Sequence, residues 1–184
     1  MEKLIEILKT FKIINYKLNE PLKNYTSFKI GGNAKILIMP SNQTQANKLF
    51  KFLFKSNYKW VLLGNATNVL ISDLGFDGVV VKFGKPFNKW KLNNNVLCVD
   101  AGMGMFELNR LCVNLSLSGL EWSYGIPGTV GGAVRMNSGC FGHSISEVIK
   151  FVKVFDGKRV KKLNRDELQF DYRNSIIKKK TILF

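Results

Sequence analysis

The sequence has few of the residues that build metal centres and disulfide frameworks. Its 184 residues include one histidine, His143, and three cysteines, Cys98, Cys112 and Cys140. The cysteines are odd in number and widely spaced, so we expect no disulfide framework. A common zinc site needs more histidine and cysteine ligands than the sequence brings together, so we predict no metal site. Cys98 and Cys112 are expected to be buried as small hydrophobic side chains.

Long apolar runs are also missing. No stretch of about 18 uninterrupted apolar residues occurs in the sequence, which argues against a transmembrane helix. The first residues place Leu4, Ile7, Leu8 and Phe11 at helical spacing, with charged residues between them. No small-residue cleavage site follows, so we expect an amphipathic helix here and not a signal peptide. These features predict a cytoplasmic protein without membrane association.

Acidic residues are scarce relative to basic ones. The sequence has 28 lysines and arginines against 13 aspartates and glutamates, a formal net charge of +15. Such an excess is typical of nucleic-acid-binding modules, and this class stays open as one alternative. However, lysines are spread through nearly every segment, and the only tight run is Lys178–Lys180. The sequence lacks the octamer of RNA-recognition motifs, the zinc knuckle and the Gly-x-x-Gly centre of KH domains. Nucleic acid is therefore the less favoured partner.

Hydrophobic residues make up 46% and charged residues 22% of the chain, as in ordinary globular domains. The apolar patterns predict helices over residues 2–11, 42–56 and 105–117, with a short helix after Asn164. They predict strands over residues 34–39, 60–63, 69–71, 78–83, 96–99, 148–155 and 160–163. Strand and helix alternate early in the chain, whereas strands dominate later. We therefore predict an α+β fold with two small lobes, residues 1–80 and 81–184.

A helix cap, the inward faces of two helices and a turn can also be predicted from the sequence. Ser41 or Asn42 is predicted to cap the second helix, because both side chains can accept a hydrogen bond from a free backbone N–H. The inward faces of the second and third helices are expected to include Phe54 and Phe106, respectively. The dipeptide Asp156-Gly157 predicts a tight hairpin between the last two strands.

The first candidate binding loop directly follows the strand predicted at residues 60–63. Its members are Gly64, Asn65, Ala66, Thr67 and Asn68. A loop of small and amide residues can present several N–H groups to a phosphate, and threonine and asparagine side chains add further donors. The same residues fit a polar turn between two strands equally well.

The second candidate is a segment with six glycines between Gly125 and Gly142. Flexible linkers of this glycine content are rich in serine, whereas here Ile126, Val130 and Met136 are interleaved, so we expect the segment to be packed. Packed glycines indicate positive φ angles or the close approach of another body to the backbone, and a bound cofactor would explain both. The order of residues matches neither a P-loop nor a Rossmann fingerprint.

A third feature is Arg173, which stands beside Tyr172 near the end of the sequence. An arginine among aromatic residues can bind a carboxylate or a phosphate through two parallel hydrogen bonds. A surface ion pair of Arg173 with Asp171 or Asp166 is an equally good interpretation of these residues alone.

These segments form part of an ordered series of motifs that closely resembles one enzyme family. The motifs are Asn24 to Gly32, Leu63 to Leu70, Asp73 to Val80, Gly119 to Ala133 and Met136 to Gly142. Their order and spacing resemble the UDP-N-acetylenolpyruvoylglucosamine reductases, flavoenzymes of peptidoglycan synthesis. The resemblance runs through nearly the whole chain, and Gly125-Ile126-Pro127-Gly128-Thr129-Val130-Gly131-Gly132-Ala133 is its most specific part.

The resemblance implies a two-lobed FAD-binding module of the vanillyl-alcohol-oxidase type. It implies that the Gly64–Asn68 loop holds the FAD pyrophosphate. It also implies flavin contacts by Ile126, Gly128, Thr129, Gly131, Gly132, Asn137 and Gly139. The implied reaction reduces the enolpyruvyl group of a UDP-sugar to give UDP-N-acetylmuramate for cell wall biogenesis, with FAD as cofactor and NADPH as co-substrate. Arg173 falls on the family's Tyr-Arg position, whose implied role is to stabilise the developing enolate through the substrate carboxylate.

Two departures from the family pattern bear on this function. Ala66 and Thr67 stand where the family has Gly and Ser, so a backbone conformation suited to glycine would be strained at Ala66. The family also continues for roughly another hundred residues, about one small domain, which holds a proton-donating serine and a catalytic glutamate. We therefore expect this chain to supply the FAD-binding part, with the C-terminal substrate domain absent or separately encoded. A flavin-binding remnant without turnover is the alternative.

Overall fold

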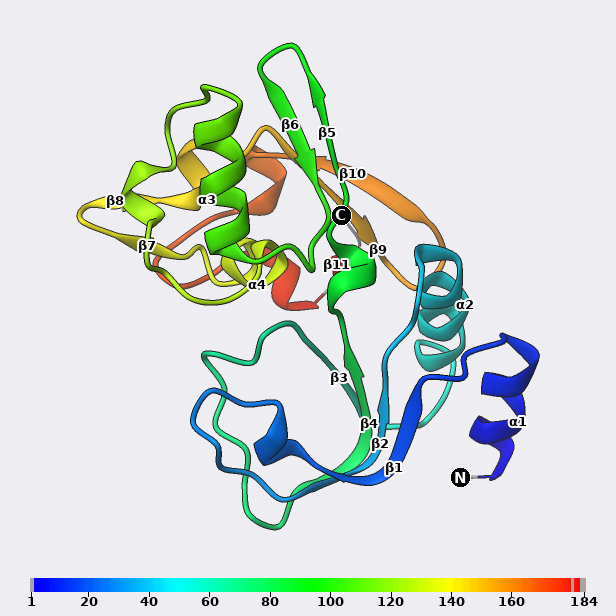
Figure 1. Ribbon diagram of the computed structural model, residues 1–184. Helices are drawn as coiled ribbons and strands as arrows, with labels where there is room; N and C mark the ends of the chain where they lie inside the picture. Colours follow the sequence, from blue (N-terminus) through cyan, green and yellow to red (C-terminus); the bar gives the residue numbers. More distant parts are fainter. Residues whose placement is uncertain (1, 180, 183–184) are drawn as a thin grey trace. The chain divides into compact units, whose positions relative to one another are not determined.

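The computed structural model describes residues 2–179 and 181–182 (Figure 1). The first part of the chain forms a four-stranded sheet. The strands are β1 (Tyr16–Pro21), β2 (Asn33–Ile38), β3 (Trp60–Leu63) and β4 (Phe76–Lys82), and the helices are α1 (Glu2–Thr10) and α2 (Gln43–Leu53). The sheet order is β1-β2-β4-β3, with β4 parallel to both neighbours and β1 antiparallel to β2. This sheet belongs to the first of two compact units, which divide the chain into residues 1–86 and 87–184.

Helix α2 begins as its sequence predicts and ends earlier. The side chain of Asn42 accepts a hydrogen bond from the backbone N–H of Gln45 (2.9 Å) and so caps the helix. The buried residues of the helix are Ala46, Leu49, Phe50 and Leu53. The helix ends at Leu53 and not at Ser56, so Phe54 lies just past it and is 37% exposed. The expected burial of Phe54 is therefore wrong.

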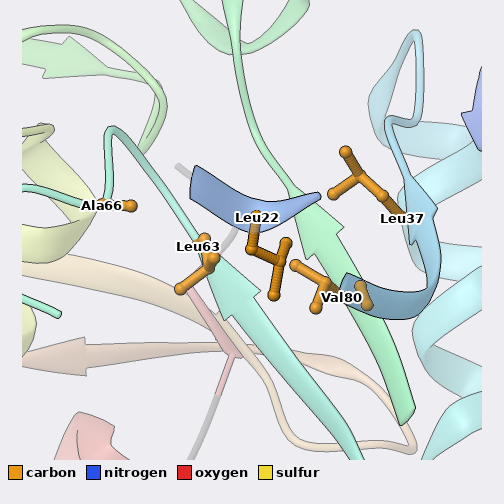
Figure 2. Packing of buried hydrophobic residues seen from close by; sticks show 6 residues of the cluster. Leu22, Leu37, Leu63, Ala66 and Val80 are labelled. Carbon is orange, nitrogen blue, oxygen red and sulfur yellow. The ribbon is translucent and has the colours of Figure 1, made fainter. Parts of the chain in front are cut away.

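A cluster of apolar side chains ties the loop after β3 to the sheet. Its buried members are Leu22, Ala34, Leu37, Leu63, Ala66 and Val80 (Figure 2). The strand expected at residues 69–71 is not found, and the fully described stretch between β3 and β4 contains no strand. Val69 and Ile71 instead pack against this cluster as partly buried loop residues. The apolar pattern there reflects packing of a loop onto the core.

Among its described residues, the second unit contains the α-helices α3 and α4, several short 3-10 helices and several small sheets; Figure 1 shows their arrangement along the chain. Its strands are β5 (Trp90–Asn93), β6 (Val96–Val99), β7 (Gly139–Cys140), β8 (His143–Ser144), β9 (Phe151–Phe155), β10 (Val160–Asn164) and β11 (Thr181–Ile182). Its helices are α3 (Met105–Asn114) and α4 (Val130–Arg135). Strand β9 pairs with β10 and β11, whereas β5–β6 and β7–β8 are separate hairpins, and each of these pairings is antiparallel.

Several elements of this unit differ from the sequence-based prediction. Strand β5 and helix α4 are not predicted, α3 ends three residues earlier than expected, and β9 begins at Phe151. Phe106 is 52% exposed and not inward, because the buried face of α3 is formed by other positions: Met105, Leu108, Asn109 and Cys112. The ring of Phe106 contacts that of Tyr124, with 5.9 Å between centroids. The Asp156-Gly157 hairpin between β9 and β10 is confirmed.

The three cysteines differ in burial. All three cysteines are free; Cys112 is buried as expected, whereas Cys98 is only half-buried. In the described part of the chain, no helix combines the length and the apolar composition of a membrane span. Lys180, the last residue of the run Lys178–Lys180, lies outside the described residues.

Candidate functional site

The loop Gly64–Asn68 follows β3 and is held at two of its carbonyl oxygens. The ammonium group of Lys82, the last residue of β4, donates a hydrogen bond to the carbonyl oxygen of Gly64 (2.7 Å). The backbone N–H of Ser27 donates to the carbonyl oxygen of Ala66 (3.3 Å). These two contacts fix the backbone of the loop against neighbouring segments of the first unit.

The direction of these two carbonyl groups sets the direction of the next N–H groups. The described residues contain no cis peptide bond, and in a trans peptide the C=O and N–H point in opposite directions. The N–H groups of Asn65 and Thr67 therefore point away from the donors that hold the carbonyls. The side chains of Asn65 and Asn68 are exposed, and that of Thr67 is half-buried. The loop thus offers N–H, amide and hydroxyl donors of the kind that bind phosphate.

The backbone at Ala66 adopts a left-handed conformation, in agreement with the strain predicted for a residue other than glycine at this position. Its φ is +50°, in the left-handed region that costs a non-glycine residue roughly 1–2 kcal/mol. Ala66 is only 6% exposed, because it packs in the core cluster with Leu63 and Val80 (Figure 2). It therefore does not fill the donor side of the loop, and the replacement of the family's glycine by Ala66 is compatible with a bound pyrophosphate.

Lys82 is a residue that the sequence-based prediction missed. Burial lowers the pKa of Lys82, because a partly desolvated ammonium group is less favourable than one in water. Its charge stands next to the loop and favours an anion there. The signal that could have found it is strand register, since parallel β3 and β4 place Lys82 opposite Leu63, immediately before Gly64.

Helix α4 orders the middle of the glycine-rich segment in the second unit. The hydroxyl of Thr129 accepts a hydrogen bond from the backbone N–H of Gly132 (3.3 Å) and caps the helix. A β-carbon added at Gly131 would lie 2.8 Å from that of Ala101, and the N–H of Gly131 bonds to the carbonyl oxygen of Ala101 (2.9 Å). Packing inside the unit therefore explains Gly131, and its expected flavin contact stays a prediction.

Gly132, the next glycine, has more open surroundings. Gly132 is exposed, and the described residues place one atom within 4 Å of a β-carbon built there, the Thr129 hydroxyl at 3.4 Å. Gly128 has a φ of +118°, a conformation that favours glycine. Ile126 is half-buried nearby in sequence. The backbone at the start of α4 therefore has room for close approach by a ligand.

The structure brings the segment of Arg173 next to two predicted site residues from a distant part of the second unit, Asn137 and Gly139. The guanidinium group of Arg173 donates a hydrogen bond to the carbonyl oxygen of Gly139 (3.0 Å). The side-chain amide of Asn137 donates to the carbonyl oxygen of Asp171 (3.0 Å). Arg173 is exposed, and within the described residues it forms no ion pair with Asp171 or Asp166. The surface ion pair is therefore not found.

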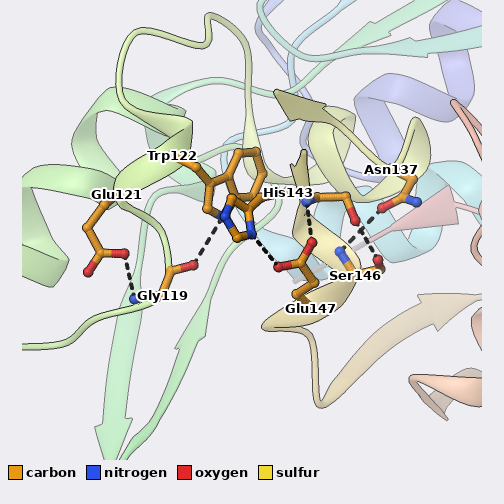
Figure 3. A network of polar contacts seen from close by, with 8 residues as sticks. Gly119, Glu121, Trp122, Asn137, His143, Ser146 and Glu147 are labelled. Atoms are coloured by element: carbon orange, nitrogen blue, oxygen red, sulfur yellow. Dashed lines mark hydrogen bonds and ion pairs between the residues drawn. The ribbon is translucent and has the colours of Figure 1, made fainter. Parts of the chain in front are cut away.

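A polar network holds the β7–β8 hairpin next to Asn137 (Figure 3). The Nδ1 atom of His143 lies 2.9 Å from one carboxylate oxygen of Glu147, and the other accepts a hydrogen bond from the N–H of Ser144 (2.7 Å). The contacts with His143 and Ser144 hold the pKa of Glu147 below its usual value. The N–H of Ser146 donates to the side-chain oxygen of Asn137 (3.3 Å). The network therefore orients the Asn137 amide.

The predicted site residues are distributed over both units. The Gly64–Asn68 loop lies in the first unit, and the remaining predicted site residues lie in the second. A family profile described as an FAD binding domain matches residues 34–159, more than half of the chain. The chain belongs to the FAD binding domain family. The matched region of this FAD binding domain includes the loop and the whole glycine-rich segment but not Arg173.

This FAD binding domain is also similar to full-length enzymes. It is 36% identical over 181 residues to the UDP-N-acetylenolpyruvoylglucosamine reductase of Bacillus subtilis strain 168, covering 98% of the chain and 60% of the relative. The crystal structure of the Thermus caldophilus UDP-N-acetylenolpyruvylglucosamine reductase superposes with a TM-score of 0.76 at 29% identity, covering 92% of this chain and 59% of that one. The predicted resemblance is confirmed, and the chain spans about three fifths of these relatives' length.

A structural neighbour with low sequence identity is similar to this chain in fold alone. The berberine bridge enzyme from Eschscholzia californica superposes with a TM-score of 0.63 at 12% identity, covering 87% of this chain and 37% of that one. Together with the family match, this similarity confirms the predicted FAD-binding fold of the vanillyl-alcohol-oxidase type.

Proposed function

We propose that the chain binds FAD and forms the flavin-binding part of an enzyme of peptidoglycan synthesis. The proposed reaction reduces UDP-N-acetylenolpyruvoylglucosamine to UDP-N-acetylmuramate, with NADPH as the reductant. Similarity to the Bacillus subtilis reductase supports this assignment. The observation that carries it is the loop Gly64–Asn68, where Lys82 and Ser27 hold two carbonyl oxygens and the following N–H groups point the other way.

The FAD pyrophosphate is assigned to the donor side of this loop. The N–H group of Thr67 would bind a phosphate oxygen, and the side chains of Thr67 and Asn68 would add donors. The charge of Lys82 would offset part of the negative charge of the two phosphates. Because the methyl group of Ala66 is buried in the core, it leaves this side of the loop clear.

The flavin ring is assigned to the glycine-rich segment of the second unit. Gly132 permits close approach of the ring to the backbone, Gly128 allows the positive φ angle of the segment, and Ile126 offers apolar surface. FAD, when bound, supplies the hydride chemistry that no side chain of this chain provides. The contribution of the chain is to bind the cofactor and to orient it.

Arg173 is assigned to the carboxylate of the enolpyruvyl group. A guanidinium group has five N–H donors, and the bond from Arg173 to the carbonyl oxygen of Gly139 uses one of them. The other donors can hold a carboxylate and stabilise the negative charge that develops beside it during reduction. The Gly139 contact would keep Arg173 in one orientation for this role.

A flavin-binding module without turnover of its own is the second candidate, since the chain spans 60% of its Bacillus subtilis relative. The two are separated by measuring UDP-N-acetylmuramate formation from substrate, NADPH and FAD. The assay uses this chain alone and this chain mixed with the part of the Bacillus subtilis reductase outside the match. Product from the mixture only supports a module that needs a partner polypeptide. Product from the chain alone excludes the second candidate, and no product from either excludes the proposed reaction.

A further inference from the structure

Helix α4 ends in a motif that favours glycine, and Asn137 occupies the glycine position. The N–H of Asn137 donates to the carbonyl oxygen of Val134 (3.3 Å). The N–H of Ser138 donates to the carbonyl oxygen of Ala133 (2.9 Å). These two bonds form a Schellman motif, which places the residue after the C-cap in the left-handed region, and the φ of Asn137 is accordingly +42°. Because glycine suits this position best, the end of the helix does not require an asparagine side chain.

The side-chain amide of Asn137 is bonded at both ends within the protein. Its Nδ2 atom donates to the carbonyl oxygen of Asp171 (3.0 Å), a residue 34 positions further along the chain. Its Oδ1 atom accepts a hydrogen bond from the N–H of Ser146 (3.3 Å; Figure 3). Two bonds at opposite ends fix the plane of an amide, which has two donor hydrogens and one acceptor oxygen. These contacts account for an asparagine at this position without a cofactor.

The carbonyl oxygen that Asn137 holds belongs to the turn that carries Arg173. Asp171 and Asn174 exchange two backbone hydrogen bonds (3.1 Å each), so Tyr172 and Arg173 form a two-residue turn. The φ of Arg173 is +49°, in a region that residues other than glycine seldom adopt. Such a conformation persists only where the surrounding structure holds it in place. The contacts of this turn therefore determine whether Arg173 keeps its conformation.

Three side-chain hydrogen bonds join this turn and its flank to α4 and to the segment after it. The guanidinium group of Arg173 donates to the carbonyl oxygen of Gly139 (3.0 Å). The hydroxyl of Ser175, a residue only 2% exposed, donates to the carbonyl oxygen of Arg135 (2.8 Å). The Asn137 amide acts two positions before Arg173, whereas the Ser175 hydroxyl acts two positions after it. The backbone is thus held on both sides of Arg173, and Asn137 holds the turn itself.

We propose that Asn137 is a positioning residue for Arg173 and not a ligand of the flavin, as the family resemblance implies. By holding the carbonyl oxygen of Asp171, it keeps the turn in the conformation from which the guanidinium group reaches Gly139. The remaining donors of Arg173 then keep one orientation, which a planar carboxylate needs in order to accept two parallel hydrogen bonds. The inference rests on the proposed function for the carboxylate, but the contact itself needs neither FAD nor turnover.

Asn137→Gly tests this role, because glycine keeps the backbone conformation without strain and removes only the side-chain amide. Nitrogen-15 relaxation at Nε of Arg173 measures the order of its side chain in the full chain without FAD, with the signal assigned from its loss in Arg173→Lys. We expect an ordered side chain in the parent and an order parameter below about 0.6, typical of flexible groups, in Asn137→Gly. An unchanged order parameter, or a parent value already below about 0.6, overturns the proposal.

Asn94→Gly is the matched control for Asn137→Gly. Asn94 is an exposed asparagine between β5 and β6 with a φ of +49°, so the chemical change and the backbone conformation are alike. We expect the order of Arg173 in Asn94→Gly to equal that of the parent, and equal loss in both variants overturns the proposal. If Asn137→Gly does not fold, Asn137→Asp takes its place, since aspartate tolerates a positive φ and its carboxylate cannot donate to a carbonyl oxygen.

Flavin binding and turnover separate positioning of Arg173 from a flavin contact. FAD affinity should be the same in Asn137→Gly and Asn94→Gly, and weaker binding in Asn137→Gly alone overturns the proposal. In the mixture with the remaining part of the Bacillus subtilis reductase, Asn137→Gly should lower kcat at least about tenfold, as for one lost charge-assisted hydrogen bond, at unchanged KM for NADPH. Unchanged kcat overturns the proposal. A parent that binds no FAD or forms no product refutes the proposed function, and the relaxation measurement then decides the positioning role.

Discussion

The ammonium group of Lys82 lies 2.7 Å from the carbonyl oxygen of Gly64 and so joins the end of β4 to the loop that follows β3. This contact holds one peptide group of the proposed pyrophosphate loop and places a positive charge beside it. Lys82→Met should weaken FAD binding about tenfold or more, because the loop loses both its anchor and the charge.

Lys35→Met is the control for Lys82→Met. Lys35 is an exposed lysine of the same sheet, and its partner is Asp77 (2.9 Å). Exposed ion pairs contribute little, so this variant should bind FAD as the parent chain does. Flavin fluorescence titration measures both affinities, and equal affinities for Lys82→Met and the parent would show that the contact does not serve the loop.

Ala66 stores backbone strain that a β-branched side chain would increase. At a φ of +50° in a buried position, Ala66→Val should lower the free energy of unfolding by about 2 kcal/mol or more. Thr67→Val is the matched control, because Thr67 is the next residue and does not have a positive φ. Urea unfolding of both variants checks this, and a similar loss in both would argue against strain at Ala66.

Gly131 and Gly132 are adjacent glycines with different expected roles. Gly131→Ala should cost about 1–3 kcal/mol of stability, because its methyl group would meet Ala101 at 2.8 Å. Gly132→Ala has room and replaces a helical glycine, so stability should rise by about 0.5–1 kcal/mol. The added methyl group at Gly132 should nevertheless weaken FAD binding. Thermal unfolding and FAD titration separate the two effects, and unchanged FAD affinity in Gly132→Ala would remove this residue from the site.

Asp156 should make stability depend on pH in the acid range. Its carboxylate accepts hydrogen bonds from the N–H groups of Arg159 and Lys158 (3.0 Å each) and pairs with Lys161 (2.6 Å). These contacts hold the pKa of Asp156 well below its ordinary value. A lowered folded-state pKa adds stability above the unfolded-state pKa of about 3.9, and this stability is lost as pH falls below it.

Asp156→Asn tests this dependence directly. The variant should be less stable than the parent at pH 7, and the difference should shrink as pH falls below about 4. Thermal unfolding across this range measures it. A difference that stays constant with pH would mean that the charge of Asp156 does not matter.

Much of the fold could be predicted because the spacing of apolar residues and the capping of helices depend on residues close together in the sequence. The cap at Asn42, one of the two residues predicted for it, and strands β3 and β6 were predictable because each depends on a few neighbouring residues. Helix α4 was not predictable in this way, since two of its six residues are glycines with low helix propensity. It is stabilised instead by the Thr129 cap and by close packing of Gly131 on Ala101. The contact of Gly131 with Ala101 joins segments far apart in sequence.

The candidate site shows the same division between local and long-range information. The strain at Ala66 was predictable from the motif, whereas the role of Lys82 was not, because a lone lysine carries no pattern. Its contact with Gly64 depends on the pairing register of β3 and β4. The contact of Arg173 with Gly139 likewise joins residues 34 positions apart. Only the folded chain brings such groups together.

Retention of FAD by the purified chain tests the central claim most directly. The chain is saturated with FAD, free cofactor is removed, and flavin absorbance is compared with protein concentration. We expect about one FAD per chain, as a single site implies, with clearly less in Lys82→Met and no loss in Lys35→Met. A purified chain that shows no flavin spectrum and takes up no added FAD would contradict the proposal that this chain binds flavin.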